Sequence, residues 1–220
     1  MTTSTSVPES TDTTTGESTG GPPMMAHSCA ELLEMDPGAR TGVHTLFDDE
    51  GAPYEAYCLM GFEGGGWTLV GRSELDAEDT PFGWRSERGS VNDTNDAYSL
   101  GAWGKGLGFT EILVADREDG EFVPFERAYI IVMPLGFVEE SESATVATVS
   151  VTTVLGDCDP PGGPSMMSYM GYTGRDDTFF VRDHMGDGGF GLRASRWALA
   201  HDNCNQGGRL NDTQGVMFVR

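Results

Sequence analysis

Acidic and amide side chains gather among glycines in the last forty residues of the chain. Asp183 and Asp187 bracket a short segment, and Asp202, Asn211 and Asp212 follow further along. Carboxylate and amide oxygens are the hard ligands that calcium prefers, and glycine lets main-chain carbonyls join the coordination shell. These residue types therefore suit a calcium site. Their spacing lacks the order of an EF-hand, so on spacing alone a surface loop with capping aspartates is the favoured interpretation.

The same region offers little support for catalysis. His184 and His201 are the only histidines near the acidic residues. No serine elbow, Cys–His signature or matched pair of carboxylates accompanies them, so neither histidine has the partner that acid–base or nucleophilic catalysis requires. We therefore expect a binding protein and assign no catalytic residue. A hydrolase acting on extracellular polysaccharide is the enzymatic alternative.

Three glycines, residues 64–66, separate two stretches of residues that favour strands. The first stretch ends near Cys58, and the second begins at Trp67. Glycine permits positive φ and lets other backbone approach closely, so the pattern predicts that the chain reverses here between two strands. Turn chemistry alone also fits a glycine-rich hairpin in any β-containing domain. Cys29, which lies twenty-nine residues before Cys58, makes the pattern more specific.

This arrangement resembles the N-terminal part of fibrinogen C-terminal-like domains and of the intelectins, which share it. Those families run from a Ser-Cys pair through a short helix and a hairpin to Tyr-Cys and then Gly-Gly-Gly-Trp-Thr. The matching residues in this chain are Ser28-Cys29, Gly42-Val43-His44-Thr45-Leu46, Tyr57-Cys58 and Gly64-Gly65-Gly66-Trp67-Thr68-Leu69-Val70. Leu59 stands where the family usually has aspartate. The resemblance implies an α+β fold, in which short helices and long loops surround a twisted antiparallel sheet.

The chain contains four cysteines, and none of them forms a Cys-x-x-Cys pair. A zinc knuckle or a thioredoxin-like site therefore lacks its usual spacing. An even number of cysteines in a glycine-rich chain favours two disulfides and an oxidising compartment, with three possible pairings. The resemblance implies a bridge between Cys29 and Cys58, which leaves Cys158 and Cys204 for the second.

The resemblance also implies what the acidic region binds. In fibrinogen-like domains a Phe-x-x-x-Asp segment carries a structural calcium ion, and in intelectins a calcium ion binds the vicinal diol of a sugar. Asp183 falls near the upstream calcium ligands of intelectins, and residues 201–204 stand where intelectins have Glu-His-His-Cys. The residues that would lie around the ligand are His184, Trp197, His201, Asn203 and Asn205.

Two departures from the intelectin pattern are present. Asp202 replaces a histidine, although carboxylate is also a calcium ligand. The chain also runs almost directly from Asp212 to an apolar closing stretch, residues 213–220, so the longer segment that carries the aromatic pocket of intelectins is missing or rebuilt.

Composition restricts the partners and the location. The 220 residues suffice for one domain, and no apolar run of about 18 residues could span a membrane. A formal net charge of −22 repels nucleic acid and anionic membrane surfaces. The family resemblance implies glycans or extracellular proteins as partners. Residues 1–27, rich in Thr, Ser, Gly, Pro and acidic residues, predict a disordered tether before a domain at 28–220.

The tether lacks the basic start and apolar centre of a secretory signal. We expect an extracellular or cell-surface protein whose signal or lipid-attachment segment lies outside this sequence. By analogy, similar Thr/Ser-rich stalks follow the anchored cysteine of bacterial surface lipoproteins, so a bacterial surface protein is expected.

Local patterns predict the elements of the domain. Ser28 and Glu31 form the signature of a capping box, which predicts a short helix ending at residues 36–38. Residues 104–108 superficially resemble a phosphate loop, but we expect no strand before them and find no Lys-Ser pair after them. The strands expected are a hairpin over 43–47 and 54–57 around a solvated acidic turn, a buried strand over 128–133, and one long strand or a hairpin over 144–155.

Overall fold

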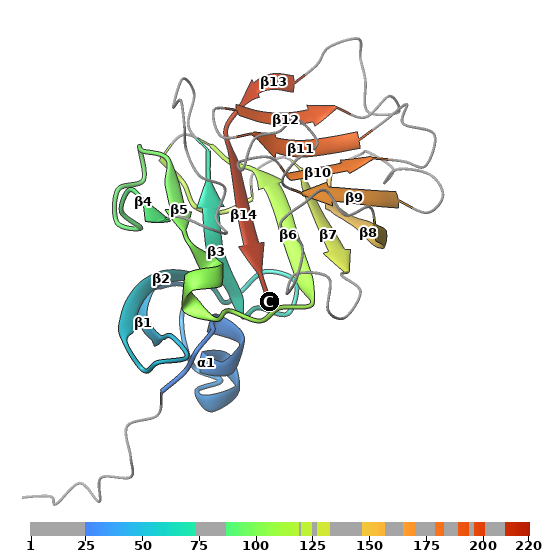
Figure 1. The fold of residues 1–220 in the computed structure, drawn as a ribbon. Coiled ribbons are helices and arrows are strands. Elements are labelled where there is room, and N and C mark those ends of the chain that lie inside the picture. Colours follow the sequence, from blue (N-terminus) through green and yellow to red (C-terminus); the bar gives the residue numbers. More distant parts are fainter. Residues whose placement is uncertain are drawn as a thin grey trace, which may run out of the picture.

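The computed structural model describes residues 25–73, 87–118, 120–124, 127–132, 147–156, 165–169, 179–182, 189–193, 196–200 and 210–220. Within these residues the strands form one antiparallel hydrogen-bonded path, β1-β2-β3-β14-β6-β7-β8-β9-β10-β11-β12-β13, with β5 attached to β3 and β4 attached to β5 (Figure 1). The helical elements are α1 (Cys29–Met35) and the 3₁₀ helix η1 (Ala102–Lys105). The strands are β1 (Gly42–Phe47), β2 (Pro53–Leu59), β3 (Trp67–Arg72), β4 (Glu87–Arg88), β5 (Tyr98–Leu100), β6 (Glu111–Asp116), β7 (Ala128–Val132), β8 (Ala147–Leu155), β9 (Ser165–Tyr169), β10 (Phe179–Arg182), β11 (Gly189–Arg193), β12 (Arg196–Ala200), β13 (Leu210–Thr213) and β14 (Gly215–Val219).

The capping signature positions α1 as predicted. The Oγ atom of Ser28 accepts a hydrogen bond of 3.1 Å from the amide of Glu31. Glu31 reaches back, but it accepts from the amide of His27 (2.8 Å) and not from that of Ser28. The first bond satisfies an amide that the first turn of a helix leaves without a helical partner, and the second attaches the residue before the cap to the helix. In the described residues no helix is long and apolar enough to cross a membrane.

The predicted hairpin is confirmed as β1 and β2, which pair from Gly42 opposite Cys58 to Phe47 opposite Pro53. Asp48 organises the acidic turn between them, because its Oδ1 atom accepts from the amides of Glu50 (3.0 Å) and Ala52 (2.8 Å). The carboxylate is therefore used as a turn acceptor, as expected for a solvated turn.

Contacts with this hairpin begin before Ser28. Ala26 is buried, and its carbonyl accepts from the amide of Phe47 at 2.9 Å. The carbonyl of His27 accepts from the hydroxyl of Tyr54 at 2.7 Å. The rest of the predicted tether, residues 1–24, lies outside the described residues.

The centre of the sheet is formed by β3, β14 and β6. The closing stretch of the sequence is β14, which inserts between β3 and β6 and pairs with both. All five of its residues are buried. The largest fully buried apolar side chains of this region are Trp67, Phe218, Leu69, Ile112 and Leu113. Burying a side chain of this size stabilises the fold by about 1.5–3 kcal/mol.

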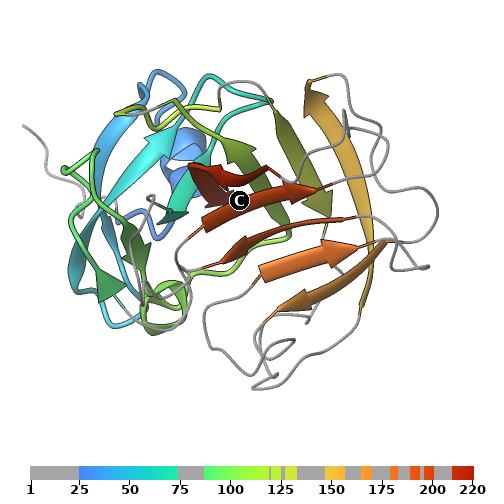
Figure 2. The same ribbon diagram turned by 90° about the horizontal axis from the view of Figure 1, so that it is seen from above.

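The later strands extend this sheet, and the strand direction changes along it. The buried strand predicted at 128–133 is β7, and the longer segment predicted at 144–155 is a single strand, β8, which pairs with β7 on one side and β9 on the other. β9–β12 run at a steep angle to β6–β8 (Figure 2). Residues 179–213 contain β10–β13, which no sequence pattern predicted.

The expectation that no strand precedes residues 104–108 is wrong. A strand, β5, does precede this segment. The next elements are η1, which residues 104–108 partly overlap, and then β6, so the strand–loop–helix order of a phosphate loop is not formed. The Nζ atom of Lys105 instead forms an ion pair with Glu87.

Candidate functional site

The strands β10, β11 and β12 place in one row the residues that precede two acidic segments of the sequence. Arg182 pairs with Gly189, and Gly189 pairs with Ala200, so these three residues form one row across β10, β11 and β12. Arg182 directly precedes Asp183 in the sequence, and Ala200 directly precedes His201. Because neighbouring strands lie about 4.8 Å apart, the Cα atoms of Arg182 and Ala200 are roughly 10 Å apart.

Most of the predicted site residues lie outside the described part of the chain. They are Asp183, His184, Asp187, His201, Asp202, Asn203 and Asn205. The backbone of the other three is described: Trp197 lies in β12 opposite Thr213, and Asn211 and Asp212 lie in β13. The side chains that the structure describes contain no group of three or more His, Cys, Asp or Glu that could hold a metal ion. The calcium ligands therefore stay a prediction.

The first predicted disulfide is confirmed. Cys29 and Cys58 are bonded, with their Cα atoms 5.4 Å apart. The amide of Cys29 also donates to Oγ1 of Thr68 at 3.0 Å, which attaches the start of α1 to β3. Cys158 and Cys204 lie outside the described residues, so their pairing stays a prediction.

The glycine run reverses the chain as predicted, since Cys58 pairs with Thr68 across β2 and β3. All three glycines have positive φ, between 75° and 87°. A Cβ atom at Gly65 would collide with the carbonyl oxygen of Met60, and one at Gly66 would lie 2.9 Å from Cα of Ala30. Side chains are thus excluded both by the backbone conformation and by the close approach of neighbouring backbone.

The side chain of Arg220 contacts this turn, and no sequence pattern predicted the contact. Its Nη1 atom donates to the carbonyls of Glu63 (2.6 Å) and Gly65 (3.0 Å). Its guanidinium carbon lies 4.0 Å from the centre of the buried Trp67 ring, and Nε pairs with Glu111 at 2.7 Å. The turn and its partner are 155 residues apart, so no local pattern could have indicated the contact.

No family model matches the sequence. The structure does match a solved one, the fibrinogen-like globe domain of human ANGPTL6, with a TM-score of 0.50 over 92% of this chain and 98% of that chain. The fold is fibrinogen-like. At 15% sequence identity the likeness concerns the fold alone, and it confirms the fold class predicted from the sequence. Within this fibrinogen-like fold, the intelectin-like ligand set and a bacterial origin stay predictions.

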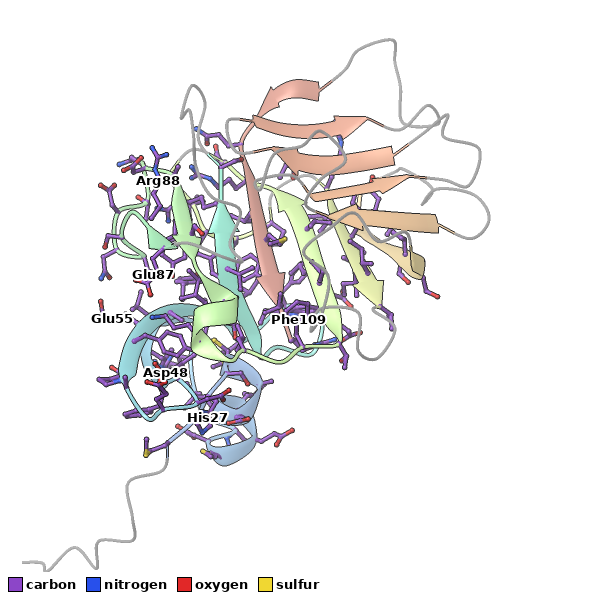
Figure 3. All side chains as sticks on the ribbon, in the orientation of Figure 1. His27, Asp48, Glu55, Glu87, Arg88 and Phe109 are labelled. Atoms are coloured by element: carbon purple, nitrogen blue, oxygen red, sulfur yellow. A yellow bond between two sulfur atoms is a disulfide. The ribbon has the colours of Figure 1, made fainter. Side chains whose placement is uncertain are left out.

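A second group of titratable side chains surrounds Tyr54, at the corner of the fibrinogen-like fold where Figure 3 labels His27 and Asp48. Burial raises the pKa of the Tyr54 hydroxyl, and the carboxylates of Asp48 and Glu31 raise it further. The Nζ atom of Lys105 lies 5.4 Å from the centre of the Tyr54 ring. The Tyr54 hydroxyl donates a hydrogen bond to the carbonyl of His27, so only the protonated form of Tyr54 can make this contact.

Proposed function

We propose that this chain is an extracellular, calcium-dependent carbohydrate-binding domain. Sugar hydroxyl oxygens would complete the coordination of a calcium ion held by Asp183, Asp187, Asp202, Asn211 and Asp212. The observation that carries the proposal is the row formed by Arg182, Gly189 and Ala200. The two acidic segments start directly beside this row.

The spacing of the row suits one shared ion. A carboxylate oxygen lies about 3.5 Å from its own Cα atom, and calcium–oxygen distances are about 2.4 Å. Two aspartates that face one another across an ion can therefore span about 12 Å between their Cα atoms. The Cα atoms of Arg182 and Ala200, which precede the two acidic segments, are roughly 10 Å apart, so the two segments start within that span of one another.

The charge of the chain favours the same ligand class. With 35 acidic and 13 basic residues, the chain attracts divalent cations and repels polyanions. A sugar is neutral, so its hydroxyl groups can approach a calcium ion that this surface holds. The oxidised pair Cys29–Cys58 supports a location outside the cell, where disulfides persist.

A glycan array probed in calcium and in EGTA tests the proposal. We expect binding to at least one glycan class in calcium and its loss in EGTA. Asp202→Asn should weaken that binding at least about tenfold, because it removes one charged ligand. Glu50→Gln, which removes one charge from the exposed β1–β2 turn, is the matched control and should bind as the wild type does. Glycan binding that persists in EGTA would overturn the proposed mechanism.

The alternative is a protein-binding or adhesion module in which calcium only orders loops. One observation favours it: Gln214 alone separates β13 from β14, so this part of the chain has no room for the aromatic segment that shapes the sugar pocket of intelectins. In that case calcium would raise the melting temperature, as ligand binding to the native state does, while the array stayed empty in both conditions.

A further inference from the structure

Two arginines are buried at the end of the sheet where β3 and β6 finish. Arg72 is 2% exposed and Arg117 is 3% exposed. Buried arginines require partners for their donors, because a guanidinium taken out of water without hydrogen bonds is strongly unfavourable. The guanidinium groups of Arg72 and Arg117 donate hydrogen bonds to main-chain carbonyls of several loops.

Arg72 binds the loop between β4 and β5, residues 89–97 (Figure 1). Its Nε atom donates to the carbonyl of Asp96 at 2.7 Å. Its Nη2 atom donates to the carbonyl of Ser90 at 3.3 Å and to that of Asp93. Its guanidinium also lies near two aromatic faces, 5.0 Å from the ring centre of Phe122 and 5.7 Å from that of Tyr98.

Arg117 joins the same loop to the rest of the sheet. Its Nη1 atom donates to the carbonyls of Thr94 (3.2 Å) and Glu121 (3.3 Å). Its Nη2 atom donates to the carbonyl of Ser73 at 3.4 Å, and its amide donates to the carbonyl of Gln214 at 3.1 Å. Arg117 therefore connects the loop with the residues that follow β3 and precede β14.

We propose that Arg72 and Arg117 form a permanent cationic centre that orders residues 90–96, in the role that a bound metal ion has in many loops. Four of the six main-chain carbonyls that accept from the two guanidinium groups belong to residues 90–96, so the loop turns these carbonyls inward. Asn92, Asp93, Asn95 and Asp96 are exposed on the outer side. The consequence is a rigid polar surface whose arrangement does not depend on calcium.

The charge of the centre persists at neutral pH. Burial lowers the pKa of Arg72 to about 10, and the neighbouring Arg117 lowers it further, but this pKa is still well above physiological pH, so Arg72 stays protonated. A lysine could carry the charge, but it could not direct donors to three carbonyls in one plane together with aromatic stacking. None of the proposed calcium ligands belongs to this arginine centre, so an experiment on the centre tests it independently of the proposed function.

Hydrogen exchange followed by mass spectrometry on the whole chain tests this centre. The reporters are the amides of Asp93, Asn95 and Ala97, which donate within the loop. In the wild type we expect equal protection of these amides in calcium and in EGTA. Arg72→Lys should speed their exchange about tenfold while peptides from β6 and β14 stay protected. Arg40→Lys, at an exposed arginine, is the matched control and should change nothing.

Two outcomes would overturn the proposal. Loss of protection in EGTA would mean that a metal ion orders the loop. Unchanged protection in both Arg72→Lys and Arg117→Lys would mean that the arginines do not order it. If both variants unfold globally, the comparison of wild type in calcium and in EGTA still decides, because a chelator effect confined to residues 89–97 contradicts a built-in centre.

Discussion

Truncating Arg220 to alanine removes one side chain that closes the glycine turn. The main-chain bonds of this residue survive the change, because the Arg220 amide donates to Glu111 and its carbonyl accepts from Thr110 and Glu111. The side chain is 25% exposed, so solvent screening limits its ion pair with Glu111 to about 0.5–1 kcal/mol. The bonds to the carbonyls of Glu63 and Gly65 contribute about 1–2 kcal/mol, and the stack on Trp67 about 0.5–1 kcal/mol.

Loss of these contributions in Arg220→Ala should lower the free energy of unfolding by about 3 kcal/mol. For a chain of this size the melting temperature should fall by about 6–12 °C. Thermal unfolding followed by circular dichroism and by tryptophan fluorescence measures the change. Arg220→Lys should recover part of it, because lysine keeps the charge but not the planar fork. Arg40→Ala is the control, since Arg40 is exposed.

A fall of less than about 2 °C in the Arg220→Ala melting temperature would refute the reasoning. A double-mutant cycle with Glu111→Gln separates the ion pair from the other contacts, and we expect a coupling of about 0.5–1 kcal/mol.

Three further predictions follow from the described contacts. Gly65→Ala should destabilise the fold by at least about 2 kcal/mol in urea unfolding, because Gly65 has positive φ and a Cβ atom there would collide with the carbonyl of Met60. Gly61→Ala is the control and should be tolerated, because a Cβ atom there meets nothing within 4 Å. Equal effects of the two substitutions would contradict this steric explanation. Cys58→Ala should lower the free energy of unfolding by about 3–4 kcal/mol, because the 29-residue loop is no longer closed in the unfolded chain, and a reductant should lower the stability of the wild type by at least as much. Burial raises the pKa values of Tyr54 and Tyr98, so above about pH 10 the unfolded chain releases these protons first and stability falls as pH rises. Tyrosinate absorbance and loss of circular dichroism should therefore change together, and ionisation of these tyrosines before unfolding would argue against their burial.

Local elements were predictable because their causes lie within a few residues. The capping signature at Ser28 predicted α1, and residues 64–66 predicted the reversal between β2 and β3. The apolar stretch 128–133 predicted β7 for the same reason. The partner of Cys29 was predicted through a family resemblance, and the structure confirms it.

The site was harder to predict, because ligand sets depend on which strand ends become neighbours. The sequence predicts a calcium-binding composition at Asp183 and Asp202, but only the antiparallel order of β10–β12 places Arg182 and Ala200 in one row. Strands β10–β13 are only four or five residues long, and β11 contains two glycines, so their periodicity carries little signal.

The sequence by itself therefore determined the short-range features of this protein: its caps, its glycine turn, its strands of clear periodicity and its acidic character. Tertiary structure alone decided that β14 lies between β3 and β6, that Arg220 stacks on Trp67, and that Arg72 gathers the carbonyls of a distant loop. The physical reason is that these contacts depend on the register of strands far apart in the chain. That register is set by burial across the whole sheet and not by any local pattern.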